Sequence, residues 1–80
     1  MSHAQEDRLV NNLIEAKKIA KELYPYDWRL RIQPFKEKIK VKMQADAIDE
    51  ILAAARIGKN LKGHDGILCL AAAVDMIEPE

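Results

Sequence analysis

The strongest local candidate for chemistry is a short segment with glycine on both sides, Lys62-Gly63-His64-Asp65-Gly66. A histidine beside an aspartate can serve as a general base or a metal ligand, because imidazole titrates near neutral pH. A metal site needs further ligands, and His3 is the only other histidine. The simpler interpretation is structural: the glycines permit a turn, and Asp65 caps the helix that follows.

No other pattern typical of an enzyme is present. The sequence has no glycine-rich phosphate loop, no nucleophile elbow and no paired-carboxylate motif. We therefore expect a protein that is not an enzyme and that has no catalytic residues, no cofactor and no metal ion. A metal-dependent enzyme built on His64 and Asp65 is a remote alternative.

Aromatic and basic side chains concentrate in the middle of the chain. Tyrosine, tryptophan and arginine dominate binding energies at protein interfaces, and five such residues lie within eight positions around Pro25. Three lysines follow at every second position. For Trp28, the simpler alternative is that its ring anchors the core. The predicted partner-binding residues are Tyr24, Tyr26, Trp28, Arg29, Arg31, Lys38, Lys40 and Lys42.

Charge is strongly segregated along a chain whose formal net charge is zero. Residues 28–44 carry six basic and one acidic side chain, whereas residues 45–80 carry three basic and seven acidic ones. A basic patch with interleaved aromatics fits an acidic protein surface, and it also fits nucleic acid through stacking and phosphate contacts. The neutral total disfavours nucleic acid, since such domains are usually basic overall. A lysine-rich face exposed only to solvent, an acidic face imitating a nucleic-acid backbone, and pairing of basic and acidic faces between subunits are further interpretations.

The first 23 residues predict an amphipathic helix over about residues 3–23. Apolar residues recur every three or four positions from Leu9 to Leu23, and Val10 and Ile14 widen this stripe. Ser2 and Gln5 fit a capping box. The helix is expected to end before Pro25, because the residue preceding a proline disfavours helical backbone angles.

Residues 28–43 predict a β-hairpin. Apolar and polar residues alternate in two short runs, as in a strand with one buried face. A proline-containing segment around Pro34 separates the runs, which favours an antiparallel two-stranded ribbon. The apolar members of the runs are Trp28, Leu30, Ile32, Ile39, Val41 and Met43.

Two further helices are predicted over about residues 46–57 and 66–77. Asp46 is a suitable N-cap for the first, and Gly58 is a suitable terminator. The second contains an uninterrupted apolar run from Ile67 to Val74, which indicates a position at the centre of the fold or at a subunit interface. Eight apolar residues are too few to cross a membrane, which takes about 20. Cys69 lies in this run and is expected to be a small core residue.

These elements predict a single α+β domain over residues 1–80, with a two-stranded ribbon packed on helices in the order helix, hairpin, helix, helix. Small phage-encoded inhibitors and some small DNA-binding folds share this order, an analogy of topology only. We expect a cytoplasmic regulator or inhibitor, of the kind that phages or plasmids encode as accessory proteins, which binds another protein with an acidic surface. A nucleic-acid-binding regulator using residues 28–42 is the alternative. Alanine supplies 11 of the 39 hydrophobic residues, so the core is thin and a homo-oligomer is expected.

Overall fold

The computed structural model describes the backbone of residues 2–79 and the side chains of residues 13–79. Four helices follow one another: α1 (Ser2–Leu23), α2 (Trp28–Asp46), α3 (Glu50–Gly58) and α4 (His64–Ile77). No strand occurs within residues 2–79, so the predicted α+β class is wrong and this part of the chain is all-helical. The analogy to folds of the helix, hairpin, helix, helix order falls with the hairpin.

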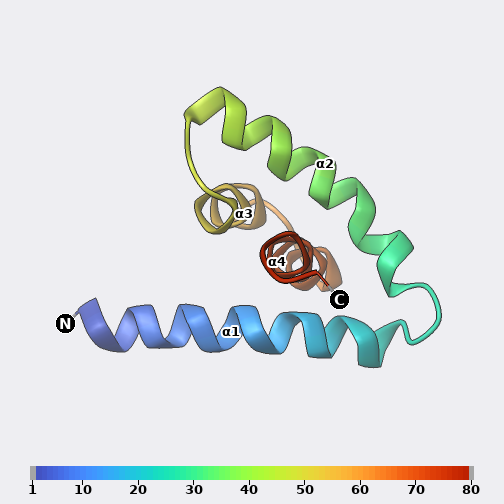
Figure 1. Cartoon of the computed structure of the whole chain (residues 1–80). Helices are drawn as coiled ribbons and strands as arrows, with labels where there is room; N and C mark the ends of the chain where they lie inside the picture. The colour runs from blue at the N-terminus through green and yellow to red at the C-terminus, as the bar shows by residue number, and fades with distance from the viewer. Residues whose placement is uncertain (1, 80) are drawn as a thin grey trace.

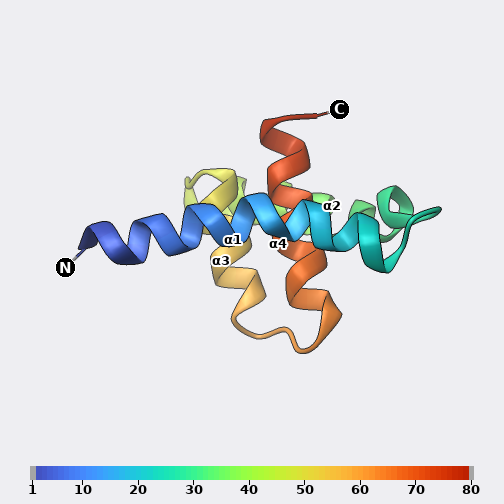
Figure 2. The same cartoon turned by 90° about the horizontal axis from the view of Figure 1, so that it is seen from below.

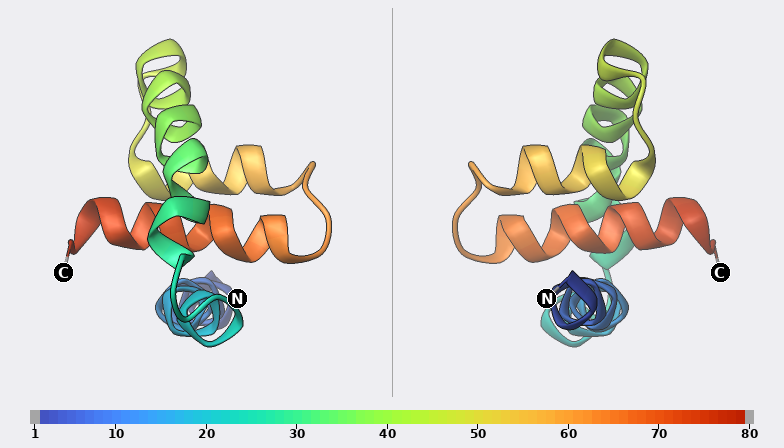
Figure 3. Two further views of the ribbon diagram at one scale, coloured as in Figure 1. Left: turned by 90° about the vertical axis from the view of Figure 1, so that its right-hand side faces the viewer. Right: turned by 90° about the vertical axis from the view of Figure 1, so that its left-hand side faces the viewer.

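Helix α4 lies at the centre of the molecule and packs against each of the other three helices. It runs antiparallel to α3, and this pair lies between α1 on one side and α2 on the other (Figures 1 and 3). α1 crosses α4 and also contacts α2, but its described residues do not reach α3 (Figure 2). The central position predicted for the apolar run of residues 67–74 is confirmed.

Alanines allow α3 and α4 to pack closely. Five of them are fully buried, and small side chains let two helix axes approach each other. Cys69 is also fully buried, and its thiol donates to the Ala54 carbonyl over 3.6 Å. Burial raises the pKa of Cys69 to about 11, so the thiol is a core group, as predicted. The buried alanines are Ala53, Ala54, Ala71, Ala72 and Ala73.

The segment predicted as a hairpin is the single helix α2. Its buried side chains are Trp28, Ile32, Phe35 and Ile39, spaced by four, three and four residues, which is the period of a helix. The alternating pattern was misleading because two of its apolar members, Leu30 and Val41, are 76% and 66% exposed. These two side chains point away from the core, and the remaining apolar residues form one helical stripe.

Pro34 lies inside α2 instead of in a turn. Proline cannot donate a hydrogen bond to the carbonyl four residues earlier, here that of Leu30, and such a position ordinarily costs about 3 kcal/mol. Both Pro34 and Leu30 lie on the solvent-exposed face of α2, where water can satisfy that carbonyl. The burial of the apolar stripe therefore outweighs the local preference for a break.

The other helix ends differ from the predicted ones in detail. Asp46 ends α2, and Asp49 is the N-cap of α3, where its carboxylate accepts from the Leu52 N–H over 2.9 Å. Helix α4 begins at His64, after Gly63 with a φ of 60°, so Asp65 lies within the first turn and does not cap it. The predicted capping box of Ser2 and Gln5 lies outside the residues whose side chains are described.

Within residues 2–79, no helix combines the length and the apolar character needed to span a membrane.

Candidate functional site

Trp28 is a core residue, as the simpler interpretation of this tryptophan held. It is buried at the start of α2, with 7% of its surface exposed. Three cations surround its ring: the Lys21 Nζ and the Arg29 Cζ each lie 5.2 Å from the ring centre, and the Lys17 Nζ lies 5.8 Å away. Such contacts add to the packing of the ring. Trp28 therefore packs at the junction of α1 and α2, with little of its surface exposed.

The corner between α1 and α2 contains the two predicted tyrosines. The Arg31 guanidinium lies 4.1 Å from the centre of the Tyr24 ring, and its Nε donates to the Asp27 carboxylate over 2.9 Å. Tyr26 is 99% exposed and points away from this cluster. The structure therefore brings Tyr24 and Arg31 together but separates them from Tyr26.

A helix groups the basic residues of residues 28–42 differently from a strand. Residues three, four or seven positions apart share one side of a helix, whereas alternate residues do not. Lys38 and Lys42 therefore lie with Arg31 along one flank of α2, and Lys40 lies with Arg29 on the other. The expected common face of Lys38, Lys40 and Lys42 is absent from the described structure, because it required a β-strand.

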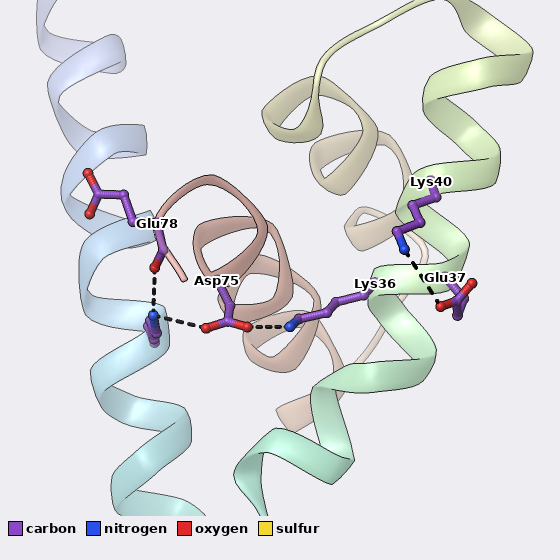
Figure 4. Close-up of polar contacts among 6 residues, drawn as sticks. Lys36, Glu37, Lys40, Asp75 and Glu78 are labelled. Carbon is purple, nitrogen blue, oxygen red and sulfur yellow. Dashed lines mark hydrogen bonds and ion pairs between the residues drawn. The ribbon is translucent and has the colours of Figure 1, made fainter. Parts of the chain in front are cut away.

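Most of these cations are already paired with carboxylates of the same chain. The Nζ of Lys42 lies 3.2 Å from Asp46, and that of Lys40 lies 4.0 Å from Glu37 (Figure 4). Lys38 forms no ion pair within the described residues, and its Nζ lies 5.4 Å from the centre of the Phe35 ring. The positive field of α2 is therefore weaker than its sequence suggests. Carboxylates of the chain compensate it least around Lys38.

An apolar groove lies beside Lys38, between α2 and α3. It is open to solvent along its length and has a volume of about 570 Å³. Lys38 and Lys42 both line it, and lysine can cover apolar surface with its methylenes while its ammonium stays in water. The lining residues are Glu37, Lys38, Val41, Lys42, Ala45 and Ile57. We call this surface the α2–α3 groove.

A largely buried ionic cluster ties α1, α2 and α4 together. The Asp75 carboxylate binds the Lys17 Nζ over 3.0 Å and also binds the Lys36 Nζ, and the Lys17 ammonium donates to the Glu78 carbonyl over 3.0 Å (Figure 4). The side chains of Asp75 and Lys17 are each only 11% exposed. Burial alone would raise the pKa of Asp75, but the hydrogen bonds from Lys36 and Lys17 outweigh it and the pKa is lowered.

Sequence reasoning missed this cluster, because its members lie far apart along the chain. The one available signal was Asp75 itself, an acid directly after the long apolar run of α4. An aspartate so placed on a central helix must be paired with cations.

The candidate chemical pair His64 and Asp65 is exposed at the start of α4. The Nδ1 of His64 lies 3.1 Å from the Tyr24 hydroxyl, and the two rings meet edge to face with centres 6.0 Å apart. Among the described residues, no three side chains of the types that bind metals are grouped closely enough to hold an ion. His64 therefore forms a contact between the start of α4 and the end of α1.

Comparison with family models, curated proteins and solved structures finds no match to this chain.

Proposed function

We propose that this chain binds another protein through the α2–α3 groove and that the partner contributes an acidic amphipathic helix. The observation that carries the proposal is the exposure of Val41. This apolar side chain is 66% exposed, beside a groove whose other lining residues include Ala45 and Ile57. Exposed apolar patches rimmed by polar groups mark interaction sites.

The dimensions of the groove support a helix as the occupant. From Glu37 to Ala45, α2 advances about 12 Å at 1.5 Å per residue, which is about two helical turns. A partner helix would place two or three apolar residues, spaced by three or four, along this length. Burying the exposed part of the Val41 side chain against the partner would by itself contribute about 1 kcal/mol to the binding free energy.

Charge supports an acidic partner. Lys38 and Lys42 line the groove one helical turn apart, and α2 carries six basic and two acidic side chains. Carboxylates flanking the apolar face of the partner helix would lie near these ammonium groups, which favours fast and selective association. In this proposal the protein acts in the cytoplasm as a regulator or inhibitor, and it does so by binding its partner and not by catalysis.

Nucleic-acid binding through α2 is the alternative function. The ion pairs of Arg31, Lys40 and Lys42 within the chain weaken the attraction of α2 for phosphates, on which nucleic-acid binding chiefly depends. The protein partner is favoured because it can also fill the apolar part of the groove at Val41, Ala45 and Ile57. Imitation of nucleic acid by the acidic side chains is disfavoured, because cations of the same chain already bind some of these carboxylates. Asp46 and Asp75 are each bound by two cations.

The test is a titration with a designed helical peptide that carries leucines at helical spacing and glutamates on both flanks. We expect binding that Val41→Asp weakens at least tenfold. Leu30→Asp is the matched control, since Leu30 is a similarly exposed apolar residue of the same helix outside the groove. Equal weakening by both variants, or equal binding of a peptide with lysines on its flanks, would contradict the proposal. Preferential, strongly salt-dependent binding of DNA or RNA oligonucleotides would favour the alternative.

A further inference from the structure

A second apolar surface lies on a different part of the molecule. The described residues of α1 do not reach α3, and a hollow of about 210 Å³ lies over α4 between these two helices. Ile14 is 64% exposed beside the hollow, and Ile77 is 46% exposed. The lining residues are Leu13, Ile14, Ile51, Val74, Ile77 and Glu78. We call this surface the α1–α4 face.

The accessible surface of the chain exceeds that of a closely packed monomer. Folded monomers of 9.1 kDa expose about 4,900 Å² by the usual scaling with mass. This chain exposes 5588 Å², which is about 700 Å² more. One partner in a standard interface buries about 800 Å², which is similar in size to this excess, and the part of α1 that extends past the other helices also contributes to the excess (Figure 1).

The shape of the α1–α4 face suits a second copy of the same face. A two-fold dimer requires one patch to be complementary to itself, so a protrusion and a recess must lie on the same patch. Ile14 is the protrusion and the adjacent hollow is the recess, with room for a branched aliphatic side chain. The chain has a formal net charge of zero, so two copies approach without net repulsion.

α1 also extends beyond the body of the molecule. Its N-terminal part runs past α3 and α4, and its backbone there has no other helix against it (Figures 1 and 2). The thin, alanine-rich core gives a further reason for a second subunit, since small domains often gain stability by association.

We infer that the chain forms a two-fold homodimer through the α1–α4 face, with Ile14 of each subunit seated in the hollow of the other. The α2–α3 groove is lined by other residues, five of α2 together with Ile57 of α3, so each dimer leaves both grooves accessible. Such a dimer would present two binding sites to its partner, and an assembly with two sites gains avidity when both engage. The dimer itself does not depend on the function proposed for the groove.

Sedimentation velocity over a wide range of protein concentration tests the dimer. We expect the wild-type chain to move as a species of twice 9.1 kDa and to dissociate on dilution. Ile14→Glu should raise the dissociation constant at least about thirtyfold, as for a residue at the centre of an interface. Ile77→Glu should raise it as well, whereas Leu30→Glu on α2 should leave it unchanged.

Circular dichroism of each variant establishes that the fold is retained, and Ile77→Glu supplies the test if Ile14→Glu does not fold. A wild-type chain that stays monomeric at the highest concentration would overturn the inference. A dimer that Leu30→Glu disrupts as strongly as Ile77→Glu would also overturn it, because the interface would then lie on another face.

Discussion

Removal of the Asp75 carboxylate should be among the most destabilising single changes in this chain. Asp75→Ala removes the carboxylate that binds both the Lys17 and Lys36 ammonium groups, in a region where Lys17 is only 11% exposed. Breaking a buried ion pair by removing one partner costs about 3–5 kcal/mol. Because the cluster retains some contact with water, we expect about 3 kcal/mol, at the lower end of that range.

That loss is large for a domain of this size. Eighty residues correspond to an unfolding free energy of about 4–12 kcal/mol. A loss of 3 kcal/mol should lower the melting temperature by about 12–24 °C. Urea unfolding followed by circular dichroism measures the free energy, and a thermal scan measures the shift.

The chain offers a matched control and a rescue. Asp46 is also bound by two cations, Lys42 and Arg56, but it lies on the surface, so Asp46→Ala should cost much less. Adding Lys17→Met to Asp75→Ala should restore part of the stability, because methionine keeps an apolar chain and removes a largely buried positive charge. An Asp75→Ala variant no less stable than Asp46→Ala, with no rescue by Lys17→Met, would refute the reasoning.

Three further predictions concern acid, the thiol and a helix end. The lowered pKa of Asp75 means that its carboxylate takes up a proton at a higher pH in the unfolded chain than in the folded one. The ionised carboxylate therefore stabilises the fold fully above the unfolded pKa of 3.8, and this stabilisation is lost as the pH falls through the lower folded pKa. In urea unfolding between neutral pH and pH ~2.5, the unfolding free energy should therefore fall less steeply with acidification in Asp75→Asn than in the wild type. Cys69, with a pKa of about 11 and no exposed surface, should react with a thiol reagent at pH ~8 only as fast as the chain opens, and Asp75→Ala should accelerate this labelling; rapid labelling of the folded wild type would contradict its burial. Ala47→Gly should raise the unfolding free energy by about 1 kcal/mol, because Ala47 has a left-handed φ of 54° that glycine adopts without strain; an unchanged or lower value in urea unfolding would count against it.

The helices with a continuous apolar stripe could be predicted from the sequence. The first predicted helix corresponds to α1, because Leu13, Ala16 and Ala20 repeat at helical spacing and are buried. The last predicted helix corresponds to α4, because a long apolar run with three alanines favours a buried helix over a strand. In both segments local propensity and burial agree.

Helix α2 could not be predicted because two periods coincide in its sequence. Trp28 and Ile32 fit a strand when Leu30 is counted with them, and they fit a helix when Phe35 is counted instead. Pro34 tipped the interpretation toward a turn, although a proline on an exposed helix face can be tolerated. Packing of this segment against α4 selects the helix over the strand.

One of the two exposed residues that disturbed the helical pattern is also informative about function. Val41 fits no buried stripe of α2, and it lines the α2–α3 groove instead. An apolar residue on the outer face of a helix violates the pattern that folding alone would favour, and such violations concentrate at functional sites. Of the predicted binding residues, Lys38 and Lys42 line the groove, whereas Trp28 belongs to the core.

Methyl-resolved NMR can observe the binding of an acidic amphipathic helix to the α2–α3 groove residue by residue. The acidic helical peptide described above is titrated into the isotope-labelled full chain, and the methyl signals of Val41, Ala45 and Ile57 are followed. We expect these signals to shift together and saturate, while the methyl signals of Leu30 stay in place. Saturable shifts confined to residues outside the groove, or none at any peptide concentration, would contradict it.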